Sequence, residues 1–207
     1  GLLHMLKASV DAGVKRFVYS SSSSVYGDVE QFPTPEDTSL NPMSPYALQK
    51  LVGEQYCHLF SELYDIETVS LRYFNVYGER MNFEGAYKTV VAVFTEQSLN
   101  GEKLNIVNDG EQRRDFTYVG DVVNANIMAS ISNPDDDAFG QVYNVGTGSN
   151  YSVNEIAAMV SEDTVYLPPR IGESRVTLAD IQKIEKTFGW RPQVKVEDWI
   201  AEQLNGN

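Results

Sequence analysis

Residues 1–20 read GLLHMLKASVDAGVKRFVYS and predict an α/β fold. Apolar side chains recur at helical spacing from Leu2 to Val10, and Gly13 follows them as a natural helix C-cap. Residues 16–20 are then expected to form a short buried strand. A helix that ends in glycine and leads directly into such a strand is one half of a βαβ unit. The expected architecture is therefore α/β.

Helices and strands are expected to alternate through the rest of the chain. Ser44 can cap a helix that has Pro45 in its first position and runs to about residue 64. Residues 21–45 are punctuated by prolines and are expected to be irregular. Further strands are expected at 68–73, 103–107 and 142–145, and further helices at 87–100, 119–132, 153–161, 178–188 and 196–204.

The expected strands are too few for a complete doubly wound sheet. Such a sheet has about six strands, whereas about three or four of those expected here belong to one sheet. Gly146-Thr147-Gly148 lacks the third glycine of a dinucleotide-binding turn, and the sequence offers no other glycine-rich turn between a strand and a helix. We therefore expect the C-terminal portion of a larger protein.

Composition argues against several kinds of partner and site. The 207 residues carry 16 Lys and Arg against 29 Asp and Glu, a formal net charge of −13 at pH 7. A surface this acidic repels nucleic acids and anionic lipids, and no apolar run approaches the ~20 residues that cross a bilayer. The single cysteine, Cys57, permits no internal disulfide, which predicts a cytoplasmic protein. Two histidines without a Cys/His cluster predict no metal site.

The first candidate motif is Tyr46-Ala-Leu-Gln-Lys50, near the start of the expected helix at 44–64. A spacing of four residues places the phenol and the ammonium group on one face of a helix. Because a nearby cation stabilises a phenolate, Lys50 would make Tyr46 usable as a base. Taken alone, the pattern has an ordinary alternative, a half-buried ring beside a solvated charge.

The second candidate motif is the serine run at 20–24, which Val25-Tyr26-Gly27 follows. Hydroxyl groups directly after a buried strand lie at the carboxyl edge of the sheet, where open α/β sheets bind ligands. A flexible serine linker is the alternative, but such linkers rarely lie between a strand and Val-Tyr-Gly. The two motifs together predict a catalytic site at this edge.

The sequence resembles the extended short-chain dehydrogenase/reductases, specifically the NAD-dependent nucleotide-sugar epimerase/dehydratase group. The resemblance covers essentially the whole chain, and by it the GxxGxxG turn and the acidic ribose-binding residue of intact members would lie upstream. It rests on FVYSSSSSVYG at 17–27, SPYALQK at 44–50, LRYFNVYG at 71–78, RRDFTYVGD at 113–121, YNVG at 143–146 and RIGE at 170–173.

The resemblance implies an enzyme with NAD as its cofactor. Tyr46 resembles the general base, and Lys50 resembles its partner and a contact of the nicotinamide ribose. Ser22 resembles the hydroxyl that hydrogen-bonds the reacting sugar oxygen. Contacts with the cofactor are implied for Tyr46 and Lys50, and also for Ser20, Ser21, Tyr73 and Phe74.

The resemblance also implies a set of substrate contacts. Arg114 and Arg170 resemble a clamp on the diphosphate, a role that suits the planar guanidinium group, and Glu173 resembles an acceptor for a ribose hydroxyl. Arg114 could instead pair with Asp115 or Asp121, and Arg170 could be an ordinary surface residue. The implied substrate site further includes Ser22, Ser24 in the sugar pocket, Asn75 at the diphosphate and Thr177 beside the sugar.

The residues favour one reaction within this group. Ser24 stands where dehydratases and decarboxylases carry an acidic residue, so the resemblance implies a 4-epimerase, an isomerase of carbohydrate metabolism. Tyr46 would remove the C4 hydroxyl proton while hydride passes transiently to bound NAD. Thr177 leaves room for an acetamido group, and residues 83–87 resemble those of hexosamine epimerases. This favours a UDP-N-acetylhexosamine over a UDP-hexose such as UDP-glucose. The alternatives are a nucleotide-sugar dehydratase or reductase, and a non-catalytic remnant that binds a nucleotide sugar.

The expected organisation is the C-terminal portion of a doubly wound Rossmann domain with a small mixed α/β substrate-binding lobe. Residues 1–78 are assigned to the Rossmann domain, with 115–146 returning to it, and residues 79–114 and 147–207 to the lobe. The resemblance also implies a homodimer through the helices at 1–13 and 44–64. The apolar side chains of these helices could instead face the sheet.

Overall fold

A three-stranded parallel sheet forms the centre of the fold. The computed structural model describes residues 1–81, 89–169 and 174–205. Strands β1 (Arg16–Ser22), β2 (Glu67–Tyr73) and β7 (Gln141–Val145) lie in the order β1-β2-β7. The register pairs Ser22 with Tyr73 and Tyr73 with Val145, so the carboxyl ends of all three strands meet at one edge. This confirms the expected α/β class, and β1 continues to Ser22 rather than ending at Ser20.

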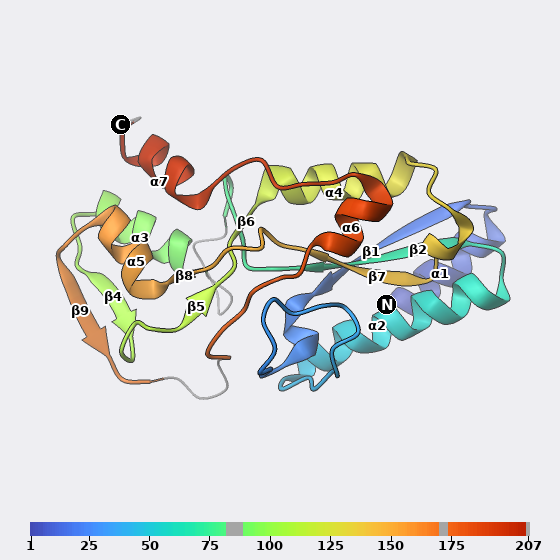
Figure 1. The fold of residues 1–207 in the computed structure, drawn as a ribbon, viewed down its shortest axis with the longest axis horizontal. Helices are drawn as coiled ribbons and strands as arrows, with labels where there is room; N and C mark the ends of the chain where they lie inside the picture. The colour runs from blue at the N-terminus through green and yellow to red at the C-terminus, as the bar shows by residue number, and fades with distance from the viewer. Residues whose placement is uncertain (82–88, 170–173, 206–207) are drawn as a thin grey trace.

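Helices cover both faces of this sheet (Figure 1). Helix α2 (Pro45–Leu63) lies on one face with α1 (Leu2–Asp11) beside it, and α4 (Val119–Ile131) and α6 (Gln182–Phe188) lie on the other. The core on the side of α4 and α6 is closed by apolar side chains from the strands and both helices. Its fully buried members include Val69, Leu71, Ala129, Tyr143, Ile184 and Trp190.

Helix α2 begins as its sequence predicts. Ser44 Oγ accepts a hydrogen bond of 3.1 Å from the Ala47 amide, and Pro45 occupies the first turn. The helix lies very close to β1 at Gly53, where an added Cβ would stand 2.2 Å from the hydroxyl oxygen of Tyr19. A side chain at position 53 would therefore require the Tyr19 ring or the helix to shift.

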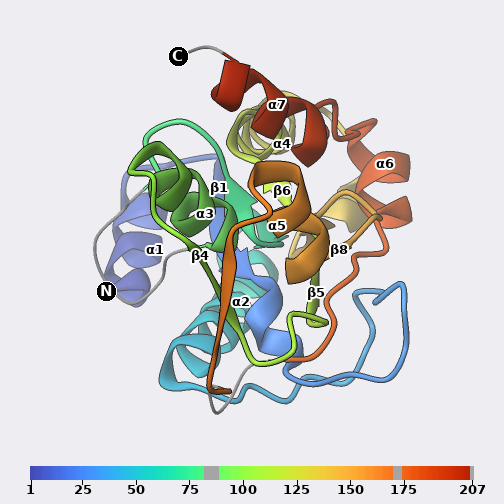
Figure 2. The same ribbon diagram turned by 90° about the vertical axis from the view of Figure 1, so that its left-hand side faces the viewer.

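A second group of elements lies beyond the carboxyl edge of the sheet (Figures 1 and 2). Three helices, α3 (Val90–Leu99), α5 (Val153–Val160) and α7 (Val196–Asn205), pack together around their own core, which includes Phe94, Ile156 and Trp199. The strands of this group pair as β4 (Leu104–Val107) with β9 (Thr164–Leu167) and β5 (Arg113–Arg114) with β8 (Tyr151–Ser152). Strands β3 (Val76–Tyr77) and β6 (Thr117–Tyr118) connect the two groups, and the short helices are η1 (Ser23–Tyr26) and η2 (Asp136–Ala138).

The members of the two hydrophobic cores can be compared with the expected division into domains. Ile184, Phe188 and Trp190 belong by sequence to the lobe at 147–207, but they pack in the core of the central sheet. The division at 1–78, 79–114, 115–146 and 147–207 itself stays a prediction.

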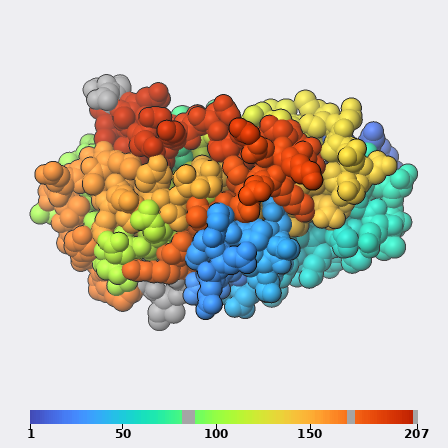
Figure 3. All heavy atoms as spheres, viewed as in Figure 1, coloured from blue at the N-terminus to red at the C-terminus, as the bar shows by residue number. Residues whose placement is uncertain are grey.

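The prediction of a helix over 178–188 is wrong for its first four residues. The Thr34 amide donates to the Leu178 carbonyl at 2.8 Å, and the Asp180 amide donates to the Thr34 carbonyl at 3.0 Å. The loop after η1 and the segment before α6 therefore lie side by side (Figure 3), and the helix begins only at Gln182. Backbone groups engaged with Thr34 cannot make the bonds of a helix.

The other expected elements agree with the structure to within a few residues. The helix expected at 87–100 is α3, which starts at Val90 after Thr89, and the part of it at 87–88 lies outside the described residues. Strand β9 and the two-residue strands β3, β5, β6 and β8 were not predicted. None of the described helices is long and apolar enough to cross a membrane.

Candidate active site

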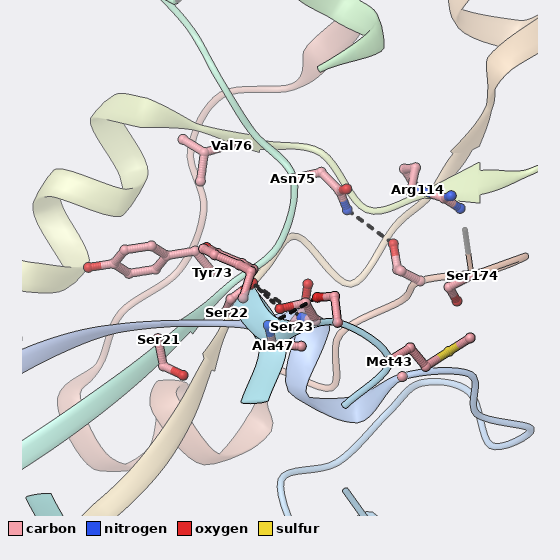
Figure 4. A pocket seen from close by; sticks show the side chains of 15 residues that line it. Ser21, Ser22, Ser23, Met43, Ala47, Tyr73, Asn75, Val76, Arg114 and Ser174 are labelled. Carbon is pink, nitrogen blue, oxygen red and sulfur yellow. Dashed lines mark hydrogen bonds between the residues drawn. The ribbon is translucent and has the colours of Figure 1, made fainter. Parts of the chain in front are cut away.

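A cavity of about 380 Å³ opens at the carboxyl edge of the sheet. It lies where β1 and β2 end and α2 begins, the place where open α/β sheets bind ligands. Most of the predicted site residues that the structure describes line this cavity (Figure 4): Ser21, Ser22, Ser24, Tyr46, Tyr73, Asn75, Arg114 and Thr177. None of its described lining residues is Asp, Glu, His or Cys.

Tyr46 lines this cavity, and Lys50 lies beside its ring as their spacing predicts, although neither Lys50 nor Ser20 is among the residues that line the cavity. Tyr46 is 39% exposed and is one of the residues that line the cavity. Lys50 Nζ lies 5.6 Å from the centre of the Tyr46 ring and donates a 2.7 Å hydrogen bond to the Ser20 carbonyl oxygen. Burial lowers the pKa of Lys50. The ammonium group is therefore held against β1, beside the ring of Tyr46.

Ser22 holds its hydroxyl at the start of η1. Ser22 Oγ accepts hydrogen bonds from the Ser24 amide at 3.2 Å and from Ser24 Oγ at 3.0 Å. A hydroxyl can accept two hydrogen bonds and donate one. The hydrogen of Ser22 can therefore be donated to an oxygen of a bound molecule, which suits the role that the resemblance implies.

Ser20 and Ser21 point in different directions because side chains alternate along a strand. Ser20 Oγ lies 3.0 Å from the hydroxyl of Tyr73, which itself donates to Asn126 Oδ1 at 2.9 Å. Ser21 borders the cavity, but its hydroxyl is buried and donates to Glu54 Oε1 at 2.5 Å. The part of Asn126 in holding Tyr73 could not be found from sequence, because α4 and β2 meet only in the folded chain.

Phe74 does not line the cavity. Its ring is fully buried in a small core with Val25, Tyr26 and Ala179, and it lies 6.3 Å from the ring of Tyr26. Its backbone amide donates to the Val145 carbonyl at 3.0 Å. The predicted contact between Phe74 and the cofactor is therefore not one that its side chain makes from this cavity.

Asn75 and Thr177 both line the cavity and are joined by a hydrogen bond. Asn75 Nδ2 donates to Thr177 Oγ1 at 3.1 Å and to the Asp115 carbonyl at 2.9 Å. Thr177 Oγ1 also accepts from the Asp115 amide at 3.2 Å. These bonds hold three segments that are far apart in sequence around one wall of the cavity.

Asp115 holds the wall of the cavity together, a structural part that its sequence motif does not reveal. Its buried carboxylate accepts hydrogen bonds from the amides of Thr147, Gly148 and Ala179 at 2.8, 3.1 and 3.0 Å. Burial raises the pKa of the Asp115 carboxyl, and these hydrogen bonds oppose the rise. From the sequence, Asp115 is expected only as a possible partner for Arg114, whereas its carboxylate ties together the loops that carry Thr177.

Arg114 lies at the cavity beside Asn75 and Ser174 (Figure 4). Its Nη1 donates to the Arg113 carbonyl at 2.9 Å. The alternative partner Asp121 accepts instead from the amides of Gln193 and Val194, at 2.9 and 3.1 Å. Three other predicted positions, Arg170, Glu173 and the stretch at 83–87, lie outside the described residues.

The cavity fits one part of a dinucleotide site. Tyr46 and Tyr73 line this space, and a phenol and the ammonium group of Lys50 beside it are groups that can bind ribose hydroxyls. The sequence contains no glycine-rich turn that would hold a dinucleotide diphosphate at a helix N-terminus. The residues present therefore fit the reactive end of the cofactor.

The chain is similar in sequence and in structure to known proteins. Residues 1–146 match the NAD dependent epimerase/dehydratase family. A putative UDP-glucose 4-epimerase of Methanocaldococcus jannaschii is 36% identical over 99% of this chain and 67% of its own length. The crystal structure of UDP-glucose 4-epimerase from Thermotoga maritima with UDP-glucose superposes with a TM-score of 0.91 at 37% identity, covering 99% of this chain and 67% of that one.

A second solved structure carries a different sugar nucleotide. UDP-N-acetylglucosamine 4-epimerase from Methanobrevibacter ruminantium, in complex with UDP-N-acetylmuramic acid, also superposes with a TM-score of 0.91. It is 34% identical over 99% of this chain and 66% of that one. The chain thus spans about two thirds of the length of these relatives.

Proposed function

The chain belongs to the NAD dependent epimerase/dehydratase family, and from this we propose that it carries the catalytic and sugar-binding side of an NAD-dependent UDP-hexose 4-epimerase. The observation that carries the proposal is the cavity lined by Ser22 and Tyr46, with the ammonium group of Lys50 beside the Tyr46 ring. Because the described lining residues include no carboxyl, imidazole or thiol, Tyr46 is the group best suited to act as base.

The chain's own residues act on the oxygen at C4 of the sugar. Tyr46 takes the proton of the C4 hydroxyl, and the ammonium group of Lys50 lies beside its ring. Ser22 donates its hydrogen to the same oxygen and so fixes the sugar in the cavity. NAD, when bound, supplies the reversible oxidation at C4. Tyr46 then returns the proton after the sugar has turned over, which gives the 4-epimer.

The serine at position 24 favours epimerisation over elimination of water. Ser24 Oγ donates to Ser22 Oγ at 3.0 Å and has no acidic proton near neutral pH. Elimination across C5 and C6 needs a second group that transfers protons, and the described lining residues offer no carboxyl for it. A dehydratase is therefore the less well supported alternative.

The diphosphate and the sugar are proposed to bind at the opposite wall of the cavity. The guanidinium group of Arg114 suits a diphosphate, and Asn75 presents an amide beside it. Thr177 is small, and we propose that the space beside it accepts the acetamido group of a UDP-N-acetylhexosamine. Arg170 and Glu173 are proposed to complete the nucleotide contacts.

The test is an assay of 4-epimerisation of UDP-N-acetylglucosamine and of UDP-glucose with the longest available form of the protein. We expect the protein to interconvert UDP-N-acetylglucosamine and UDP-N-acetylgalactosamine. Separation of the two epimers measures this reaction. Equal turnover of UDP-glucose with no activity on UDP-N-acetylglucosamine would overturn the proposed sugar class. Binding of a UDP-sugar in calorimetry without any 4-epimer would instead identify a non-catalytic binding protein.

The substitution Thr177→Tyr is expected to reverse the sugar preference. A ring at this position fills the space beside Asn75, so kcat/KM for the N-acetylated sugar should fall about 10-fold or more relative to UDP-glucose. Thr177→Val is the matched control, because it removes the oxygen that accepts from Asn75 without filling the space. We expect Thr177→Val to affect both sugars alike. A similar ratio for the two variants would contradict a steric role.

A homodimer through α1 and α2 is also proposed. Leu48 and Leu63 of α2 are 52% and 67% exposed, and Leu3 and Met5 of α1 are 45% and 60% exposed. Exposed apolar side chains gathered on two adjacent helices are typical of an interface, whereas Leu6 is fully buried and faces inward. We expect Leu63→Glu to convert a dimer to a monomer in sedimentation equilibrium. A monomer already present with the unchanged sequence would rule out this interface.

A further inference from the structure

Directly beneath the cavity, three polar side chains that the proposed reaction does not use are buried together. Glu54 and Arg72 form an ion pair in which Arg72 Nη2 lies 2.8 Å from Glu54 Oε2, and their side chains are 4% and 2% exposed. Arg72 Nε donates to the other oxygen, Oε1, at 2.9 Å, so the pair is bidentate. Ser21 Oγ donates to this same oxygen at 2.5 Å.

The position of Glu54 in α2 connects this cluster with the proposed catalytic groups. Tyr46, Lys50 and Glu54 follow one another at intervals of four residues, so they lie along one face of the helix. Lys50 donates to the backbone of Ser20, and Glu54 accepts from the side chain of Ser21. Two successive turns of α2 are therefore fastened to two successive residues of β1.

Arg72 extends the same connection to the neighbouring strand. It pairs in register with Ser21, and it precedes Tyr73, which lines the cavity. Its guanidinium carbon lies 4.7 Å from the centre of the Tyr26 ring, and its Nη1 donates to the Glu36 carbonyl at 3.1 Å. The guanidinium group thus has a fixed position and a fixed orientation. Glu54 is held at one site relative to both β1 and β2.

Stability alone does not explain a buried ion pair at this place. Desolvating two charges costs about as much as their attraction returns, and apolar residues of similar volume often serve stability equally well. Unlike an apolar contact, however, a bidentate pair fits only one register between a helix and a strand. A small slide of α2 along β1 would break these hydrogen bonds.

We infer that Glu54, held by Ser21 and Arg72, is a positioning residue that sets where α2 presents Tyr46 at the cavity and holds Lys50 beside it. The inference rests on the proposed function, because it assigns Glu54 a part in the same reaction. Glu54 itself does not reach the substrate, since it is buried beneath the cavity and does not line it.

The chain contains a matched ion pair for the test. Arg16 and Glu67 join β1 to β2 in register, with Arg16 Nη2 2.7 Å from Glu67 Oε2, and they lie at the amino ends of the strands. Glu54→Gln therefore weakens an ion pair of α2 with β2 beneath the cavity, whereas Glu67→Gln weakens a less buried ion pair between β1 and β2 at the far ends of the strands. Only Glu54→Gln should disturb the cavity.

The first measurement does not depend on enzymatic activity. Acetic anhydride at limiting concentration labels exposed amines, and mass spectrometry of peptides gives the labelling of Lys50 relative to the exposed Lys7. We expect this ratio to rise about threefold or more in Glu54→Gln, because Lys50 leaves the Ser20 carbonyl, and to stay unchanged in Glu67→Gln. Ser21→Ala, which keeps the ion pair, should give a smaller rise and replaces Glu54→Gln if that variant does not fold. An unchanged ratio in the folded variant overturns the inference.

The second measurement is the split between kcat and KM in the 4-epimerase assay. We expect Glu54→Gln to lower kcat about tenfold or more while KM for the UDP-sugar stays within about twofold, and Glu67→Gln to leave both unchanged. Equal loss of kcat in the two variants overturns the inference, because a general loss of stability then explains it. If the unchanged protein shows no epimerase activity, the proposed function fails while the labelling ratio still decides the role of Glu54.

Discussion

Replacing Tyr46 with phenylalanine is expected to lower kcat for 4-epimerisation by about 10²–10⁴-fold, the usual contribution of a general base. Tyr46 lines the cavity, and Lys50 Nζ lies 5.6 Å from its ring centre. Phenylalanine keeps the ring and its packing but removes the oxygen that would take the proton. The loss corresponds to about 3–5 kcal/mol of transition-state stabilisation.

The measurement is kcat for the preferred UDP-sugar together with the affinity for that sugar in calorimetry. The affinity should change little, because Arg114, Asn75 and Thr177 are untouched. Tyr64→Phe, at the other end of α2 and 51% exposed, is the matched control and should retain full activity. Unchanged turnover in Tyr46→Phe would show that another group acts as base.

Replacing Arg72 with leucine is expected to lower the free energy of unfolding by about 3–5 kcal/mol, the usual loss when one partner of a buried ion pair is removed. The side chains of Arg72 and Glu54 are 2% and 4% exposed, so the carboxylate of Glu54 would stay buried without its cation. The hydroxyl of Ser21 would remain, but one hydrogen bond does not replace a bidentate ion pair. Urea unfolding followed by circular dichroism measures the change.

The double substitution Glu54→Met with Arg72→Leu separates buried charge from lost packing. Because it removes both charges, we expect it to recover most of the stability that Arg72→Leu loses. The recovered variant should still be impaired in catalysis if Glu54 positions Lys50. A double variant no more stable than the single one would show that the loss does not come from an unpaired carboxylate.

Much of the fold could be predicted from local sequence signals. Ser44 and Pro45 mark the start of α2, since the capping bond to Ala47 closes within one turn. Gly13 marks the end of α1 with a φ of 68°, a conformation that glycine adopts without cost. The start of α6 could not be predicted in this way. Its preceding residues bond to Thr34, about 140 positions earlier in the chain, and no local pattern reports such a partner.

Some features of the candidate site could likewise be predicted from the sequence, and others could not. The spacing of Tyr46 and Lys50 in the sequence was sufficient to place the phenol and the ammonium group together, because four residues make about one turn of a helix. The direction of the Ser21 hydroxyl and the burial of Phe74 could not be predicted from the motifs that contain them. Side-chain alternation assigns faces to a strand only after its register with neighbouring elements is known.

The amino-acid order alone established the α/β class, the start of the helix that carries Tyr46 and the approach of Lys50 to that tyrosine, because each depends on contacts between residues a few positions apart. Only the folded chain established that Ser22 faces the cavity while Ser21 bonds Glu54, and that Asp115 ties the wall carrying Thr177. These contacts join residues that are far apart in the sequence. The partner of each side chain therefore depends on how the strands and helices pack, and not on the residues next to it in the chain.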